Sequence, residues 1–107
     1  MLVILVLLVV LGVLINMTKM FVTIKIMPTS PEVDLDVLKS EARIKANEFG
    51  AELLDKDEIE PVAFGLKALK LMFLFDESKG SEDLVNLISE IPNVSSAEVC
   101  DMRRAVG

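Results

Sequence analysis

Histidine, tryptophan and tyrosine are absent from this sequence of 107 residues, and cysteine occurs once. Without histidine the chain lacks the usual proton shuttle at neutral pH and the most common metal ligand, which excludes many classes of enzyme. The single cysteine, Cys100, can form neither an internal disulfide nor a thiolate metal cluster. We expect it to be a structural, half-buried residue of a strand, in a protein of a reducing compartment.

Positive charge is also scarce, because 11 Lys and Arg stand against 17 Asp and Glu, a net charge of −6. Nucleic-acid binding needs a concentrated basic face, so this balance argues against direct contact with nucleic acid and favours a basic protein surface as partner. Phosphate-cradling glycine loops, nucleophile elbows and Cys-x-x-C motifs are missing, and the acidic run at 55–60 lacks the glycine turn of a calcium loop. We therefore expect no catalytic residues, metal site or cofactor, and a function based on binding another protein.

An apolar run, Leu2–Ile15, precedes the rest of the sequence. It is shorter than the about 20 residues of a membrane-spanning helix, and it lacks the basic residues and the cleavage site of a signal peptide. Two interpretations stay open. Residues 1–19 are either a mis-assigned start of translation, which we favour and which puts the true start at Met17 or Met20, or a weak membrane anchor. Residues 20–107 are expected to form one domain.

From Met20 onward the hydrophobic pattern predicts six elements in the order β-α-β-β-α-β. Alternating apolar residues at 21–26 predict a strand, and a stripe with helical spacing between Asp34, a cap, and Gly50, a stop, predicts a helix. The remaining elements are an edge strand at 52–60, a central strand at 66–75, a helix capped by Ser81 and a last strand at 94–102.

This order is typical of the ferredoxin-like split βαβ fold, a member of the α+β class. Right-handed crossovers favour a four-stranded antiparallel sheet in the spatial order four, one, three, two, with both helices on one face. The topology also places the loop before the third strand and the end of the fourth strand at opposite ends of the sheet. Phe64 and the pair Arg103 and Arg104 are therefore expected to lie roughly 20 Å apart.

Two short segments are candidates for binding. Phe64, between Pro61 and Gly65, is either an aromatic anchor that enters a partner's pocket or a side chain that packs under its own loop. Arg103 and Arg104, expected just after the last strand, either bind a carboxylate or phosphate or form a solvated tail. The residues alone leave both choices open.

The segment Glu-Pro-Val-Ala-Phe-Gly-Leu-Lys-Ala-Leu at 60–69, combined with the ending Glu-Val-Cys-Asp-Met-Arg-Arg at 98–104, resembles the archaeal elongation factor 1-beta family. It is also similar to the C-terminal nucleotide-exchange domain of the eukaryotic form. The resemblance covers essentially all of residues 20–104, in the right order of elements. The apolar leader has no counterpart in that family, which strengthens the interpretation as a mis-assigned start.

The resemblance implies a cytoplasmic guanine-nucleotide exchange factor, not an enzyme. Its partner is the GTPase elongation factor 1-alpha, from which it releases GDP so that GTP binds during translation elongation. Phe64, followed by Gly65, matches an aromatic that contacts the GTPase. Arg104, next to Arg103 and Met102, matches a terminal basic residue that enters its magnesium site, and whether Arg104 acts alone or with Arg103 stays open.

A function from a different class is a membrane-tethered ferredoxin-like module that senses a ligand or binds a protein. Contact with a membrane is expected only if residues 1–19 are genuine. Mass measurement of the native N-terminus distinguishes these interpretations.

Overall fold

The computed structural model describes residues 19–105. The apolar segment Leu2–Ile15 lies outside this range, so both interpretations of that segment stay predictions.

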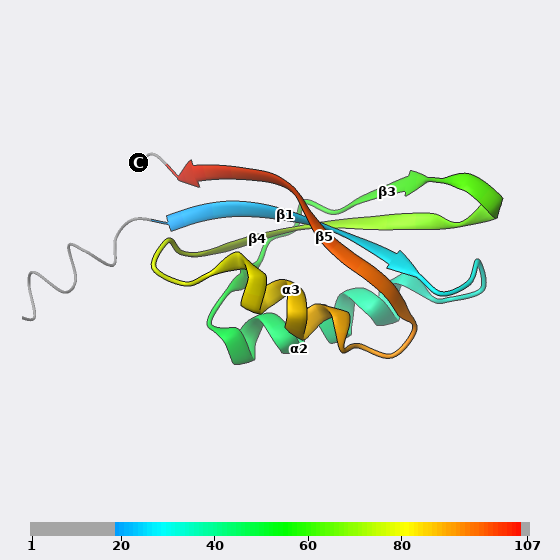
Figure 1. Ribbon diagram of the computed structural model, residues 1–107, viewed down its shortest axis with the longest axis horizontal. Helices are drawn as coiled ribbons and strands as arrows, with labels where there is room; N and C mark the ends of the chain where they lie inside the picture. The colour runs from blue at the N-terminus through cyan, green and yellow to red at the C-terminus, as the bar shows by residue number, and fades with distance from the viewer. Residues whose placement is uncertain (1–18, 106–107) are drawn as a thin grey trace, which may run out of the picture.

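The described chain forms one antiparallel sheet with both helices on the same face (Figure 1). Its strands follow the spatial order β2-β4-β1-β5, and β3 also pairs with β4, which confirms the order derived from the sequence. The elements are β1 (Lys19–Pro28), α2 (Leu35–Phe49), β2 (Glu52–Leu53), β3 (Glu58–Pro61), β4 (Lys67–Asp76), α3 (Ser81–Ser89) and β5 (Val94–Ala105).

The edge strand expected at 52–60 is two short strands instead of one. Both β2 and β3 pair with the same edge of β4. Between them, Asp57 Oδ1 lies 3.2 Å from Lys39 Nζ and Asp55 Oδ1 lies 3.8 Å from Arg43 Nη2, and both basic residues belong to α2. The expectation of a continuous strand was wrong because aspartate is a poor strand former and these two carboxylates turn toward the helix.

The ends of α2 follow from its sequence, as expected. The side chain of Asp34 accepts a hydrogen bond of 2.9 Å from the backbone N–H of Asp36, which caps the first turn. Gly50 ends the helix in the left-handed conformation at φ 94°. Lys79, from the loop after β4, donates a hydrogen bond of 2.7 Å to the carbonyl of Phe49.

The start of α3 differs from the expectation. Its N-cap is Gly80, not Ser81, and no side chain caps it. The loop before it is a turn in which Asp76 Oδ1 accepts a hydrogen bond of 2.9 Å from the N–H of Ser78, and the carbonyl of Asp76 accepts one of 3.0 Å from the N–H of Lys79. This turn brings the chain to the helix one residue earlier than the sequence suggested.

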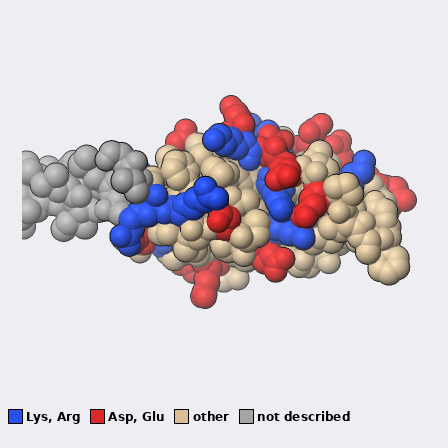
Figure 2. All heavy atoms as spheres, turned by 90° about the horizontal axis from the view of Figure 1, so that it is seen from above, with Lys and Arg blue, Asp and Glu red and all other residues tan. Residues whose placement is uncertain are grey.

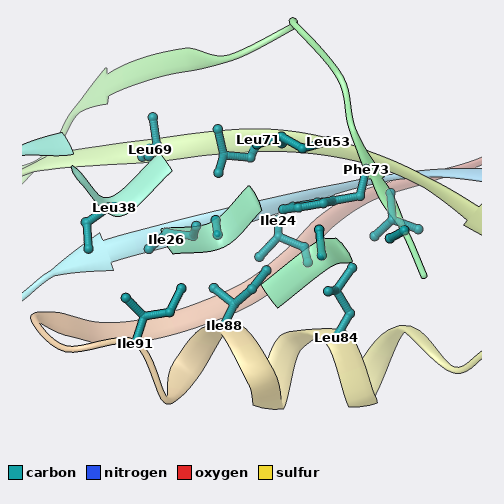
Figure 3. Packing of buried hydrophobic residues seen from close by; sticks show 14 of the residues in the cluster. Ile24, Ile26, Leu38, Leu53, Leu69, Leu71, Phe73, Leu84, Ile88 and Ile91 are labelled. Carbon is teal, nitrogen blue, oxygen red and sulfur yellow. The ribbon is translucent and has the colours of Figure 1, made fainter. Parts of the chain in front are cut away.

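The core lies between the sheet and the two helices (Figure 3). Every second residue of β1 is buried, which leaves the other face of the sheet without a covering layer. Among the side chains that are at most 2% exposed are Val22, Ile24, Ile26, Leu38, Leu71, Phe73, Leu84 and Ile88. Burial of each such side chain contributes about 1.5–3 kcal/mol to the free energy of folding. This core holds the strands in place and thereby fixes the positions of the loops at the two ends of the sheet.

The last strand corrects two expectations. β5 continues to Ala105 instead of ending at 102, so Arg103 and Arg104 lie within the strand and are not a tail beyond it. Cys100 is exposed, not half-buried. Asp101 pairs with Thr23 and Val99 with Ile24, which makes Cys100 the extra residue of a β-bulge whose side chain has no regular place in the pleat.

Candidate functional site

Phe64 projects from the loop between β3 and β4 with 93% of its surface exposed. The alternative in which this ring packs under its own loop is therefore wrong. An exposed phenylalanine costs free energy in water, about 25 cal/mol for each Å² of apolar surface. An aromatic side chain displayed at a loop tip is instead typical of an anchor for a partner's pocket.

Phe64 lies in a tight turn with an unusual backbone conformation. Phe64 has φ 62° and ψ 30°, and Gly65 has φ 73°, so two successive residues are left-handed. The N–H of Leu66 donates a hydrogen bond of 3.3 Å to the carbonyl of Ala63, which closes a tight turn with the φ angles of type I′. A left-handed conformation costs a bulky L-residue about 1–2 kcal/mol. Strain of this kind, held at one exposed aromatic, indicates a functional residue.

Gly65 permits this turn. Its positive φ is a conformation that residues with a side chain rarely adopt. The nearest neighbour to a side chain there is Pro31 Cγ, 4.0 Å from an added Cβ, so the requirement comes from the backbone angle and not from lack of space.

The two arginines lie at the opposite end of the sheet. Arg104 pairs with Met20 and Arg103 with Phe21 on β1, and Met20 in turn pairs with Phe75 near the end of β4. From Phe75 to Lys67, where β4 begins, eight residues span about 27 Å at the rise of an antiparallel strand. Phe64 lies beyond Lys67, so the two candidate segments are separated by the whole sheet, somewhat further than expected.

Arg103 and Arg104 do not form one cationic site. Successive residues of a strand point to opposite faces, so the two side chains leave β5 on different sides. Arg104 shares the helix side with Met20, which packs against the core. Arg103 Nε lies 3.0 Å from Asp101 Oδ2 of its own strand, on the open side.

Arg104 also has a partner that the sequence did not reveal. Its Nη2 donates a hydrogen bond of 2.7 Å to Glu77 Oε1, from the turn that follows β4. The contact joins residues 27 apart in the sequence and depends on β5 running on to Ala105, so no local pattern could predict it. The guanidinium stays 66% exposed and has further N–H donors.

Met102 lies two residues before Arg104 and therefore on the same side of β5. Its side chain is 46% exposed although it pairs with Val22, which is fully buried. Met102 and Arg104 together form the exposed helix-side surface at this end. Figure 2 shows basic side chains at this end of the molecule, and an uncharged protrusion with acidic and basic side chains beside it at the other.

Between the two ends, the open face carries a charged cluster. Glu60 Oε2 lies 3.3 Å from Lys70 Nζ and 3.5 Å from Lys25 Nζ. The contact with Lys70, and then the charge of Lys25, hold the pKa of Glu60 below its ordinary value, and Glu60 raises the pKa of Lys70. The two ion pairs link β1, β3 and β4, although Glu60 Oε2 is buried and accepts no hydrogen bond of good geometry.

Within residues 19–105, no helix is long and apolar enough to cross a membrane. Over the same range, no three potential acidic, histidine or cysteine ligands gather in a way that could hold a metal ion.

The family model of the EF-1 guanine nucleotide exchange domain matches residues 21–105, a range that includes both ends of the sheet. The chain belongs to this family of exchange domains. Its relatives include elongation factor 1-beta of Methanothermobacter thermautotrophicus, which is 47% identical over 83 residues, or 77% of this chain and 91% of the relative.

Two further relatives of this exchange domain show similar coverage. Elongation factor 1-beta of Methanobrevibacter smithii is 40% identical over 89 residues, covering 82% of this chain and 98% of the relative. That of Methanococcoides burtonii is 44% identical over 85 residues, covering 78% and 93%. Among solved structures, the C-terminal domain of the MgtC protein from Mycobacterium tuberculosis has a TM-score of 0.53 at 14% identity, over 84% of this chain and 89% of that one, and shows a shared fold alone.

Proposed function

We propose that this exchange domain acts in the cytoplasm on elongation factor 1-alpha, where it releases GDP so that GTP binds during translation elongation. The partner is inferred from the family and from the name of the relatives. The observation that carries the proposal is the layout of the sheet. A strained, exposed Phe64 stands at one end, and the exposed guanidinium of Arg104 stands about 27 Å or more away at the other.

The proposed roles of the two ends differ. Phe64, held by Gly65, fills an apolar pocket of the GTPase and supplies binding energy at a distance from the nucleotide. Arg104, with Met102 beside it, approaches the magnesium ion and the phosphates of the bound GDP. No bond is made or broken in this process, so the factor needs no nucleophile, general base or cofactor.

Electrostatics explains how a guanidinium promotes release. A magnesium ion bridges and neutralises the nucleotide's phosphates, so a cation that competes for its position weakens the hold on GDP. Exchange is therefore a negative coupling between the factor and GDP. A thousandfold loosening corresponds to about 4 kcal/mol, and by linkage GDP loosens the factor to the same extent. The factor must therefore bind the nucleotide-free GTPase tightly. Contacts with the GTPase at both ends of the sheet provide the large interface that this requires.

We assign the electrostatic role to Arg104 and not to the pair. The two side chains point to opposite faces, so one nucleotide site receives only one of them. Arg103 is engaged by Asp101 within its own strand. The family assignment also favours nucleotide exchange over a membrane-tethered ligand sensor, because the residues matched by the exchange-domain family include both Phe64 and Arg104.

The test is the rate of release of labelled GDP from elongation factor 1-alpha of the same organism. We expect Arg104→Ala to lose most of the stimulation, whereas Arg103→Ala, the matched control, keeps most of it. Phe64→Ala is expected to weaken binding to the nucleotide-free GTPase. Full activity of Arg104→Ala, or an equal loss in both arginine variants, would remove the assigned role.

A further inference from the structure

The outer flank of α2 carries exposed apolar residues that neither sheet end uses. Val37 and Ile44 are 54% and 51% exposed and lie seven residues apart, so they stand two turns apart on one side of the helix. Glu41 and Glu48 follow each of them by four residues and share that side. We call these four residues the α2 stripe.

At its N-terminal end the α2 stripe opens into a cleft of about 320 Å³. The cleft lies between the start of α2 and the turn that joins α3 to β5. Val33, Val37 and Pro92 form its apolar wall, and Asp34 and Glu41 form its acidic rim. The surface thus combines a concave apolar end with an apolar ridge along the helix.

The charges of α2 are divided between its two flanks. Lys39 and Arg43 face the segment between β2 and β3, where Asp57 and Asp55 neutralise them. On the stripe side, Lys45 is the basic neighbour, and its Nζ lies 4.0 Å from Glu48.

The acidic rim of the cleft is not neutralised in this way. Within residues 19–105, neither Asp34 nor Glu41 takes part in an ion pair. The cleft end of the stripe therefore holds the stronger negative charge, next to exposed apolar surface.

We propose that the α2 stripe and the cleft form a docking groove for a basic amphipathic helix of a partner protein. A helix laid along α2 with apolar residues at seven-residue spacing places them against Val37 and Ile44, with one side chain in the cleft. Lys or Arg on its flanks then meets Asp34 and Glu41. The apolar contacts supply affinity and the acidic rim selects for a basic helix. The groove uses neither Phe64 nor Arg104, so it does not depend on the exchange mechanism.

The test measures binding of a labelled synthetic helix of about 20 residues, long enough to be helical, with leucines at heptad spacing and lysines on both flanks. An acidic version of the same peptide serves as the second probe. We expect the basic peptide to bind, the acidic one not to bind, and the amide signals of α2 and of Asn93 to shift in NMR spectra. Val37→Ser with Ile44→Ser is expected to weaken binding tenfold or more.

The matched control is Ile59→Ser, because Ile59 is 52% exposed but lies on β3, away from the groove. Thermal unfolding confirms that each variant is folded, and GDP release is expected to stay unchanged in the groove variant.

Glu41→Gln is expected to weaken binding of the basic peptide severalfold and to reduce the salt dependence of that binding. The proposal is overturned if the Ile59 variant loses as much affinity as the groove variant, or if the groove variant binds as tightly as the natural chain. It is also overturned if the stripe mediates self-association that the peptide does not displace, since a second copy is then the occupant.

Discussion

Replacing Phe64 by asparagine is expected to stabilise the fold while it removes the function. Asparagine tolerates the left-handed conformation that costs phenylalanine about 1–2 kcal/mol, and Asn-Gly is the preferred pair for a type I′ turn. The ring is 93% exposed, so its removal sacrifices almost no buried surface. The net gain is about 1 kcal/mol, which raises the Tm of a domain of this size by about 4–8 °C.

Two measurements on three proteins check this reasoning. Thermal unfolding followed by circular dichroism gives the change in Tm, and stimulated GDP release gives the activity. Phe64→Ala separates the two effects, because alanine loses the ring but keeps most of the left-handed strain. We expect both variants to lose stimulation and only the asparagine variant to gain stability. A lower Tm for Phe64→Asn would show that the ring is held by its own loop, and normal exchange in both variants would show that it is no anchor.

Three further expectations concern the surroundings of the two ends. Gly65→Ala forces a side chain into φ 73° and is expected to lower the free energy of unfolding by about 1 kcal/mol or more, measured by urea unfolding, and to slow GDP release. Lys70 and Lys25 hold the pKa of Glu60 below its ordinary 4.5, so this carboxylate stabilises the fold above that pH and loses its contribution as the pH falls through the lower folded value. Glu60→Gln is therefore expected to flatten the dependence of Tm on pH below about 4.5, and an unchanged acid dependence would contradict the assignment. Glu77→Gln frees Arg104 from an exposed ion pair worth at most about 1 kcal/mol, so binding to the GDP-bound GTPase is expected to strengthen up to about fivefold with little change in Tm; weaker binding would show that Glu77 orients the arginine instead.

The order of elements could be predicted because each depends on a short pattern. The alternation in β1, the stripe of α2 and the caps Asp34 and Gly50 are local signals, and right-handed crossovers then leave one common arrangement. The separation of Phe64 from the arginine end follows from that arrangement alone. The exposure of Phe64 could not be predicted from this arrangement, because Phe64 lies in a turn whose backbone conformation phenylalanine rarely adopts.

The features that could not be predicted from the sequence depend on contacts between segments that are distant along the chain. The break between β2 and β3 accompanies ion pairs with α2, and the burial of Cys100 was misjudged because a bulge shifts the register of β5. The extension of β5 to Ala105 rests on pairing with β1 as far as Lys19. Glu77 was missed for the same reason, since its contact with Arg104 spans the end of the sheet.

In the proposed mechanism, the guanidinium of Arg104 competes with a magnesium ion for the partner's nucleotide site. The most direct test is the rate of stimulated GDP release as a function of free Mg²⁺, for the natural chain and for Arg104→Ala. We expect rising Mg²⁺ to suppress stimulation by the natural chain and to leave the small residual stimulation by the variant almost unaffected. The same Mg²⁺ dependence in both proteins would show that Arg104 does not compete with the metal ion.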